Sequence, residues 1–343
     1  MIIGLTIILI LVLILPFTKL VERNLEVFLF IMGVLSVFVS QMWSWDLVKE
    51  ALIHPINITL AVLVAGLLFR WFQNPIEKGV IGISRAMPFP LFIGLFVIII
   101  GLISSIITAI VAAIILVFVI SILKMDRKSE ILVVILACYA IGMGAALTPI
   151  GEPLSTIVVN SMKEDFFYLL ELIGIYIIPG VIVFGILAAF MVKSKKADKQ
   201  ENNDQAVEKA VREKESYPEI IIRSFKIYLF VMALTFLGAG FQPFIERYLL
   251  DLSPLVLYWI NMVSAILDNA TLAAAEISPA MSDTTVKSIL LGLIVSGGML
   301  IPGNIPNIIA AGKLNITSKE YAKYAVPIGL VGMAAYFIVI LMF

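Results

Sequence analysis

The stretch Thr148-Pro149-Ile150-Gly151-Glu152-Pro153-Leu154-Ser155-Thr156 decides how this chain folds. It lies inside an apolar run from about Ile131 to Val159 that is long enough to cross a bilayer. Its two prolines lack N–H donors, so a continuous helix cannot keep its hydrogen bonds through them. Within lipid, the freed backbone groups must find partners in the protein, in water or in an ion. The stretch therefore predicts a broken helix that lines a cavity and carries a functional carboxylate at Glu152.

The composition is that of a polytopic helical protein embedded in a lipid bilayer. Of 343 residues, 61% are hydrophobic and only 14% are charged, and the mean hydropathy is +1.08, whereas a soluble domain is nearer half apolar and a quarter charged. The net charge of +0 gives no reason to expect a nucleic-acid partner. Cys138 and His54 are the only residues of their types, which disfavours disulfide or metal-cluster chemistry. The apolar N-terminus has no basic residue before Lys19, which predicts a retained helix and not a signal peptide.

The first part of the chain predicts two scaffold helices, at residues 1–48, followed by a first structural repeat at residues 52–191. Within this repeat the apolar stretch 88–123 is too long for one crossing and has no charged loop in its middle. It therefore predicts a re-entrant hairpin with its tip near residues 104–109. The broken helix covers about 131–160, and a mixed segment at 73–87 has the character of an interfacial helix.

A charged linker at about 192–222 separates the two halves. The second repeat, at residues 224–343, follows the plan of the first. A helix and a short segment around Pro243 lead to an apolar hairpin at about 254–281 and a broken helix at about 288–312.

Two local patterns support this internal repeat. Both broken helices contain two prolines four residues apart, in Pro149–Pro153 and in Pro302–Pro306. Both hairpins have a serine four residues before a polar tip residue, in Ser104-Ser105-Ile106-Ile107-Thr108 and in Ser264-Ala265-Ile266-Leu267-Asp268. Because a hairpin adds no crossing, each unit crosses the membrane three times, so the second unit is expected to be inverted relative to the first.

The basic residues agree with that topology. With the linker on the cytoplasmic side, all but four of the 24 lysines and arginines fall in cytoplasmic segments, as the positive-inside rule requires. Both termini are then extracytoplasmic, the first hairpin enters from the cytoplasm and the second from outside. The four exceptions are Lys49, Lys163, Arg247 and Lys287.

Two carboxylates are the leading candidates for binding a cation or a proton where the hairpins and breaks meet. Glu152 precedes Pro153, where it could simply complement a helix N-terminus, but a charge at that depth costs roughly 2.5–3.5 kcal/mol. Asp268 could simply close a turn, although the first hairpin needs no carboxylate at its tip. Asn269 and Thr271 would add oxygens beside Asp268, and a sodium ion is expected at Asp268, Asn269 and Glu152.

Further oxygens lie in the same stretches. Asn304 could cap the second half-helix, and Asn307, inside that helix, is a plausible carbonyl ligand. Glu276, two turns past Asp268, could face a vestibule or lie at the outer interface, and the interface is slightly favoured. No lysine or arginine falls in a core segment, which favours a cation. The remaining candidates are hydroxyl groups that often bond only their own backbone: Thr148, Ser155, Thr156, Ser104, Ser105 and Thr108.

These motifs resemble those of the ion transporter superfamily. The run Ser264-Ala265-Ile266-Leu267-Asp268-Asn269, then Gly297-Gly298 and Pro302-Gly303-Asn304-Ile305-Pro306-Asn307, is similar to its second half. Thr148-Pro149-Ile150-Gly151-Glu152-Pro153 is similar to its S/T-P-I-G-D/E-P stretch. The likeness is greatest to NhaD-type sodium/proton antiporters and a related group of cation transporters, and more distant to arsenite and divalent-anion carriers.

The resemblance implies two re-entrant hairpins, a central site, a homodimer formed through a scaffold, and elevator-like alternating access. It places six residues on ion-binding stretches: Asp268, Asn269, Glu152, Thr148, Asn304 and Asn307. The first hairpin departs from the pattern, because Ser104-Ser105 and Thr108 stand where antiporters and dicarboxylate carriers have Asn or Asp.

The expected function is secondary exchange of Na⁺ or Li⁺ for H⁺ across the cell membrane, without a cofactor. The alternative is a cation-coupled carrier of a small anion, a dicarboxylate or an oxyanion, held by helix N-termini. An intramembrane enzyme is disfavoured because the chain offers no nucleophile–base pair or metal cluster. A channel is disfavoured by the internal repeat.

Overall fold

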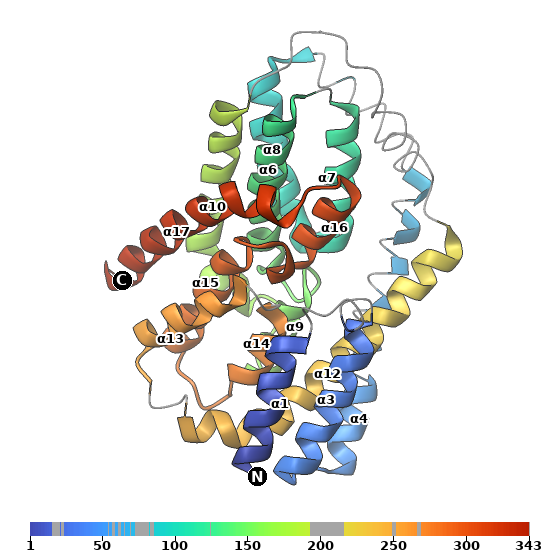
Figure 1. Cartoon of the computed structure of the whole chain (residues 1–343), viewed down its shortest axis with the longest axis vertical. Helices are drawn as coiled ribbons and strands as arrows, with labels where there is room; N and C mark the ends of the chain where they lie inside the picture. The colour runs from blue at the N-terminus through green and yellow to red at the C-terminus, as the bar shows by residue number, and fades with distance from the viewer. Residues whose placement is uncertain are drawn as a thin grey trace.

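The chain forms an assembly of helices, seen in a computed structural model (Figure 1). Every regular element in the described residues is a helix. The structure describes the chain except residues 16–20, 22–23, 54, 57–58, 61–62, 65, 69, 73–81, 83–85, 124, 193–215, 249–251, 266–268 and 343. Most of the predicted interfacial segment 73–87, the predicted linker up to residue 215, and Asp268 lie outside the described residues.

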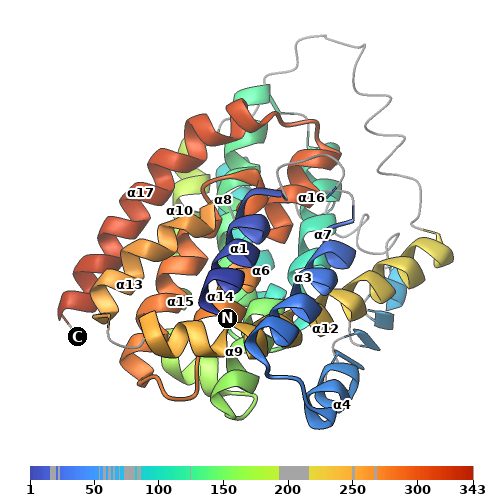
Figure 2. The ribbon, with the colours of Figure 1, turned by 60° about the horizontal axis from the view of Figure 1, so that its bottom comes forward.

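Three helices from the N-terminal part of the sequence and one from its second half lie side by side and form one bundle, here called the outer bundle. These are α1 (Ile2–Ile14), α3 (Leu25–Ser40), α4 (Trp45–Ile53) and α12 (Tyr217–Tyr248). They remain together in both views (Figures 1 and 2). The described residues between 55 and 72, at the start of the predicted first repeat, are helical as well.

The crossing of α3 and α12 depends on small residues. A Cβ at Gly33 would meet the Ala233 carbonyl at 2.7 Å, and one at Gly240 would collide with the Ser36 hydroxyl. Small side chains allow such close approach of helices where no hydrophobic effect drives them together. The ion pair of Lys226 with Glu26, 2.7 Å long, adds a second contact between the same two helices. The outer bundle is therefore tied together across the two halves of the sequence.

The first half of the remaining fold contains α6 (Phe89–Ile107), α7 (Ala109–Ile122), α8 (Arg127–Ala145), α9 (Pro153–Met162) and α10 (Tyr168–Met191). The chain breaks at Thr108, inside the predicted tip at 104–109, and again between α8 and α9, inside the predicted broken helix. Helix α8 is buried on all sides from Ile131 to Ala145. It packs against α6, α7 and α10 and forms the centre of this half.

The second half contains α13 (Pro254–Ile260), the 3₁₀ helix η2 (Asn261–Ala265), α14 (Asn269–Glu276) and α15 (Asp283–Gly297). After these come η3 (Ile301–Gly303), α16 (Ile305–Lys313) and α17 (Ser318–Met342). Helix α15 is buried like α8 and packs against α13, η2 and α17. The order of elements repeats that of the first half.

Two expectations about the linker and the segment after it are wrong. Helix α12 begins at Tyr217, so the last residues of the predicted linker at 192–222 are its first turns. The helix also continues through Pro243 to Tyr248, where a separate short segment was predicted. A proline is tolerated inside a membrane helix when neighbouring groups satisfy the freed carbonyl.

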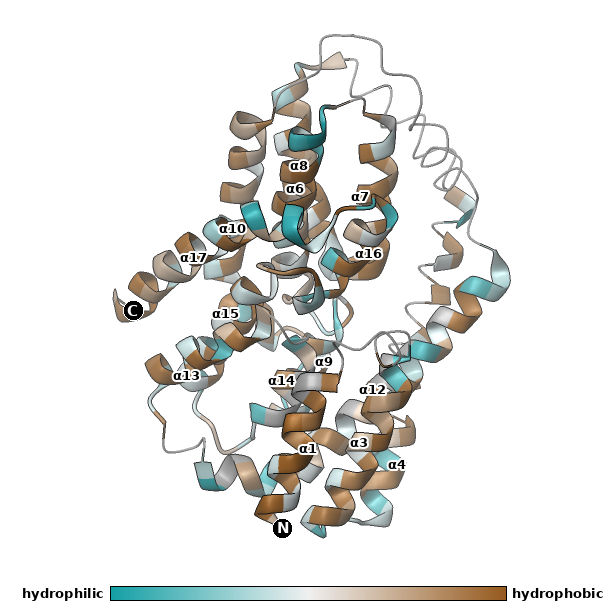
Figure 3. Ribbon diagram, viewed as in Figure 1, coloured by the Kyte–Doolittle hydropathy of each residue, from teal (hydrophilic) through white to brown (hydrophobic). Residues whose placement is uncertain are grey.

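The surface is that of a membrane-embedded protein. Five helices, α6, α8, α10, α12 and α17, are long and apolar enough to cross a bilayer. The side chains of Ile175 and Phe190 on α10 are 76% and 83% exposed, as is normal for residues that face lipid. Hydrophobic colouring runs along α1 and α7, and hydrophilic residues lie in the first turns of α8 and α17 (Figure 3).

Candidate functional site

Two unwound segments, at residues 146–152 and 298–304, form the core of the candidate site. Glu152 is the N-cap of α9, with φ −155° and ψ 162°, and Asn304 is the N-cap of α16, with φ −154° and ψ 147°. These two residues are 4% and 2% exposed. The shared conformation makes Glu152 and Asn304 equivalent. The proline spacing would instead align Glu152 with Ile305, so the proline alignment is displaced by one residue.

Hydrogen bonds across the two breaks confirm this register. Ser155 Oγ donates to the Ala145 carbonyl at 3.3 Å, and Asn307 Nδ2 donates to the Gly297 carbonyl at 2.9 Å. Each bond joins the first turn after the break to the last residue of the helix before it. Ser155 and Asn307 each follow their N-cap by three residues. Ala145 and Gly297 each precede their N-cap by seven residues, so both partners of the bond are equivalent in the two breaks.

Glycines allow both breaks to fold tightly. A Cβ at Gly151 would collide with the Ala145 carbonyl, and one at Gly303 would lie 2.6 Å from the Gly297 carbonyl. The same Gly303 position faces the Ser264 carbonyl at 2.6 Å. Only glycine fits where backbone approaches backbone this closely. The second break therefore rests directly on the end of η2.

The helices before each break are held by matching serines. Ser104 Oγ donates to the Ile141 carbonyl at 2.9 Å, and Ser264 Oγ donates to the Leu293 carbonyl at 3.2 Å. Ser104 lies four residues before Thr108 and Ser264 four residues before Asp268, as the sequence pattern predicted. In a third pair of contacts, Gly144 lies against the Gly101 carbonyl, and Ser296 Oγ donates to the Asn261 carbonyl at 2.9 Å.

The first tip, at Thr108, is strained and fixed to the first break. Thr108 has φ 76° and ψ 148°, a region that residues with a Cβ rarely adopt. Its hydroxyl accepts from Val111 N at 3.3 Å and caps α7. The next residue, Ala109, donates its N–H to the Gly151 carbonyl at 2.7 Å, and Thr148 Oγ1 donates to the Ser105 carbonyl.

The second tip is described from Asn269 onward. Asn269 begins α14, is 2% exposed, and its Nδ2 has no hydrogen-bond partner. Asp268 and the Thr271 side chain lie outside the described residues, so the predicted sodium site at Asp268, Asn269 and Glu152 remains a prediction.

The two halves contact each other around the breaks. Helix α16 packs against α7 and α8, and α9 packs against α14. A Cβ at Gly142 on α8 would collide with the amide nitrogen of Asn304, so the second break lies directly against the broken helix of the first half. Tyr139, also on α8, fills the space at Gly298 and donates to the Ala325 carbonyl at 2.8 Å.

Two buried amides present oxygen atoms without partners. Asn307 Nδ2 donates to the carbonyls of Gly297 and Leu300, both at 2.9 Å, which fixes the amide orientation and leaves Oδ1 unpaired. Asn304 Oδ1 is also buried without a partner. Oxygen ligands with few charges suit a hard cation. No three His, Cys, Asp or Glu side chains come together in the part of the chain that the structure describes.

The predicted hydroxyl ligands whose side chains are described all bond to the backbone: Thr108 accepts from an N–H, and the others donate to carbonyls. Ser104, Thr148 and Ser155 make the bonds described above. Ser105 donates to the Leu102 carbonyl at 2.7 Å, and Thr156 to the Pro149 carbonyl at 2.6 Å. These groups shape the breaks, while the amides and Glu152 carry the candidate binding chemistry.

Sequence reasoning missed one buried polar pair. Glu276, predicted to face a vestibule or to lie at the outer interface, is only 7% exposed, so its side chain is enclosed by protein. Its carboxyl lies beside the amide of Asn261, which is 0% exposed. The sequence feature that indicates this pair is an asparagine within the apolar run 254–281, because an asparagine is costly in a helix that faces lipid and is expected to face a polar partner.

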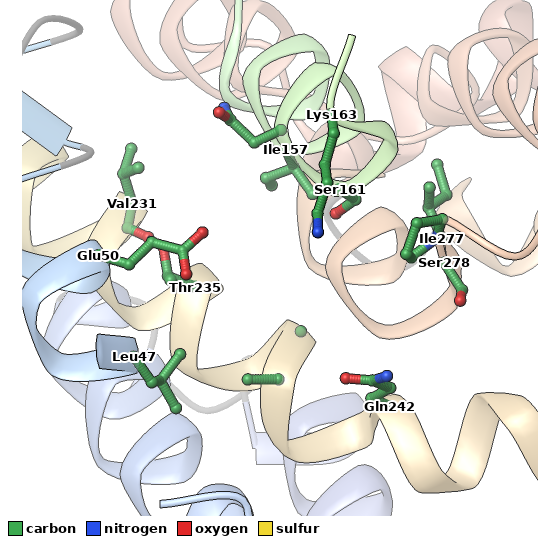
Figure 4. Close-up of a pocket in the computed structure, with 14 residues that line it drawn as sticks. Leu47, Glu50, Ile157, Ser161, Lys163, Val231, Thr235, Gln242, Ile277 and Ser278 are labelled. Carbon is green, nitrogen blue, oxygen red and sulfur yellow. The ribbon is translucent and has the colours of Figure 1, made fainter. Parts of the chain in front are cut away.

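A polar groove of about 200 Å³ lies near this pair, between α4 and α12 of the outer bundle and the ends of α9 and α14. In Figure 4, Lys163 reaches into it from the end of α9, and Gln242 faces it from α12. Ile277, Ser278 and Pro279 also line it.

The fold and its apolar surface define the class: an α-helical integral membrane protein with a polar centre formed by two helix breaks. Within that class, the chain belongs to the family described as protein of unknown function (DUF1646), whose model matches residues 2–343. Comparison with curated proteins gave no match.

Proposed function

We propose that the protein is a secondary active transporter built from two inverted repeats, which exchanges Na⁺ or Li⁺ for H⁺. One observation carries this proposal: the two breaks share an N-cap conformation and a set of hydrogen bonds, yet present a carboxylate at Glu152 and an amide at Asn304. Discontinuous helices related in this way form the ion sites of several transporter folds.

The arrangement of the helix pairs supports inversion and re-entrant hairpins. Helices α6 and α7 meet at Thr108, and their other ends lie at the top of Figure 1, whereas α13 lies in the lower part. The half-helix of each repeat packs against the second hairpin arm of the other, since α16 contacts α7 and α9 contacts α14. Such an exchange of contacts brings both tips and both breaks to one central region.

The chemistry favours a cation. Two buried amide oxygens, on Asn304 and Asn307, have lone pairs without donors, and a buried polar acceptor costs about 1–3 kcal/mol when unsatisfied. A sodium ion would satisfy them, and Glu152 would supply the negative charge. Burial favours a protonated carboxyl and a nearby cation favours the ionised one, so Na⁺ and H⁺ compete for Glu152. Asp268 is the second carboxylate in this proposal.

The outer bundle supports an elevator-like mechanism and a homodimer. It joins α1, α3 and α4 to α12 by close helix contacts, and it meets the rest of the fold chiefly where α12 packs against α14. In this proposal the outer bundle stays fixed and forms the dimer contact, while the hairpins and broken helices move. The cytoplasmic position of the linker and the extracytoplasmic termini belong to the same proposal.

The test uses full-length protein in liposomes that contain a pH-sensitive dye. Addition of Na⁺ or Li⁺ outside is expected to drive protons out and raise the internal pH, whereas K⁺ or choline does not. Glu152→Gln abolishes the response, because a neutral amide cannot exchange a proton. Glu171→Gln, at an exposed carboxylate on α10, is the matched control and keeps it. A parent protein without a Na⁺ or Li⁺ response, or a normal response in Glu152→Gln, contradicts the proposal.

One observation favours the second candidate, a cation-coupled carrier of a small anion. The N-caps of α9 and α16 make no side-chain capping hydrogen bond, so the cap side chains leave the first N–H groups of both helices available to a carboxylate or an oxyanion. Uptake of labelled dicarboxylate or oxyanion that requires a Na⁺ gradient, without Na⁺-driven proton release, would decide for this function.

A further inference from the structure

The carboxyl of Glu276 and the amide of Asn261 form a buried pair apart from the two breaks. Glu276 is the last residue of α14, and Asn261 is the first residue of η2. Asn261 Nδ2 donates to the Leu257 carbonyl at 2.9 Å, which orients the amide. Glu276 Oε2 and Asn261 Oδ1 have no hydrogen-bond partner. The pair therefore holds two oxygen atoms that nothing in the described chain satisfies.

The position of Glu276 disfavours a negative charge. The C-terminus of a helix carries a partial negative charge, so a carboxylate in the last turn is repelled where a lysine would be attracted. Removal from water adds to this, because burial favours the neutral acid. The protonated carboxyl can donate one hydrogen bond and carries no charge, so it fits this site better than the ionised form.

No described residue neutralises Glu276 by an ion pair. Helix α14 packs against α9, α12, α15 and η2, and η2 carries no charged residue. The charged side chains described at this end of the other three helices are Lys163, Arg247, Asp283 and Lys287. Lys163 lines the groove, and Arg247 is exposed over the ring of Tyr248. Lys287 donates to the Tyr176 hydroxyl at 3.3 Å, and Asp283 accepts from the Tyr168 hydroxyl at 2.7 Å.

Glu276 ends α14 beside the groove, at the opposite end of that helix from Asn269, and neither member of the pair lines the groove itself. The three residues that follow Glu276, namely Ile277, Ser278 and Pro279, line the groove. Asn269 lies seven residues before Glu276, about two helical turns or about 10 Å away on the same face of α14. One face of α14 thus joins a water-accessible region to the centre of the candidate site.

We propose that Glu276 and Asn261 form a proton-loading site, through which protons pass between water in the groove and the central ion site. In each passage a hydronium ion gives its proton to a Glu276 carboxylate oxygen and becomes water, and Glu276 then gives the proton, through intervening water, to the Glu152 carboxylate at the start of the neighbouring α9. The Asn261 amide stabilises the ionised form that exists between the two transfers. This inference rests on the proposed exchange function and supplies the route of its protons.

The experiment compares Glu276→Gln with Glu50→Gln, which changes an exposed carboxylate that lines the neighbouring groove. Infrared absorption of the protonated carboxyl group is expected to lose one band in Glu276→Gln and none in Glu50→Gln. In liposomes, Glu276→Gln is expected to slow Na⁺-driven proton release at least about tenfold, while isotopic Na⁺/Na⁺ exchange continues. An unchanged infrared spectrum or normal proton release in Glu276→Gln overturns the proposal.

A second variant, and measurements on the parent protein, distinguish a failure of the proton-loading proposal from a failure of the proposed exchange function. Asn261→Ala removes the donor that stabilises ionised Glu276, so the pH profile of exchange is expected to shift to higher pH. An unchanged profile contradicts the assignment even if Glu276→Gln does not fold. A parent that shows no Na⁺-driven proton movement refutes the exchange function, whereas the infrared comparison still tests the protonation of Glu276 by itself.

Discussion

Asn307→Ala should destabilise the protein markedly more than Ser155→Ala, although the two residues hold equivalent positions. Asn307 is 0% exposed and donates to the carbonyls of Gly297 and Leu300, both at 2.9 Å. Ser155 is equally buried but donates one longer bond of 3.3 Å, to Ala145. A hydrogen bond contributes about 1 kcal/mol net, and a buried carbonyl left without a donor costs about 1–3 kcal/mol.

The Leu300 carbonyl keeps a second donor, because Gly303 N lies 3.3 Å from it. Asn307→Ala thus loses two bonds and leaves the Gly297 carbonyl without its amide donor, at a cost of about 2–4 kcal/mol, of which removal of the unpaired Oδ1 returns about 1 kcal/mol. Ser155→Ala loses one long, weak bond to the Ala145 carbonyl, so its cost is at the low end of this range, about 1 kcal/mol. Equilibrium unfolding of the parent and the two purified variants in mixed detergent micelles, in Na⁺-free buffer, measures both losses in unfolding free energy.

The same two variants distinguish a loss of structural hydrogen bonds from a loss of ion binding. Asn307 Oδ1 is unpaired in the structure, so Asn307→Ala is expected to reduce the stabilisation that added Na⁺ gives, and Ser155→Ala to preserve it. If Asn307→Ala lies within about 0.5 kcal/mol of the parent, or destabilises no more than Ser155→Ala, the reasoning from hydrogen bonds is refuted. An unchanged Na⁺ response in Asn307→Ala would remove this amide from the ion site.

Two further predictions concern helix starts. Thr108→Gly should raise the unfolding free energy by about 1 kcal/mol, because it releases the strain of φ 76°, which costs about 1–3 kcal/mol. Thr108→Ala keeps that strain and loses the cap, so it should lower the unfolding free energy by about 1 kcal/mol. Thermal unfolding that shifts in the same direction in both variants would contradict this. Asp126→Ala should cost about 1 kcal/mol, because Asp126 caps α8 through Ser129 N and Oγ at 3.1 and 2.8 Å. The Ser129 hydroxyl lowers the pKa of Asp126 in the folded protein below 3.8. The cap therefore contributes its full stability above pH 3.8 and loses that contribution as the pH falls through the folded-state pKa of Asp126. A difference in stability between the parent and Asp126→Ala that persists in strong acid would disprove this reasoning.

Local chemistry was enough to locate the breaks from sequence. Two prolines inside an apolar run cannot continue a helix in lipid, and the chain does unwind at residues 146–152 and 298–304. Length was enough to locate the first tip, because one apolar stretch of 36 residues exceeds a single crossing, and the helix breaks at Thr108. These features depend on a few neighbouring residues and on the thickness of the bilayer.

The register of the two breaks could not be predicted from the prolines. Proline is compatible with any position in the first turn of a helix, where its missing N–H has no partner to lose. It occupies the first position of α9 and the second position of α16. The shared Pro-x-x-x-Pro spacing therefore misaligned Glu152 with Ile305 by one residue. Backbone conformation at the N-cap is required to pair Glu152 with Asn304.

The environment of Glu276 depends on tertiary packing, which sequence spacing does not give. Helical periodicity placed Glu276 on the same face as the tip but did not say whether that face meets lipid, water or protein. Because η2 and α15 pack against α14, the carboxyl is enclosed beside Asn261. Asp268, one of the two carboxylates that the sequence marks as leading candidates, remains a sequence-based prediction because it lies outside the described residues.

The matched positions reveal a chemical asymmetry between the proposed repeats. At four positions the second half has an asparagine: Asn261, Asn269, Asn304 and Asn307. The equivalent residues in the first half are Gly101, Ala109, Glu152 and Ser155. At these four positions the second half thus contributes neutral amide oxygens and the first half a titratable carboxylate, on similar backbones. If the central site binds a cation, its neutral ligands come mainly from the second half, while the protons that compete with it bind at Glu152 and at the proposed second carboxylate, Asp268. Exchange of Asn304 and Glu152 between the halves should therefore move the titrating group without abolishing the oxygen site, which two identical sites would not allow.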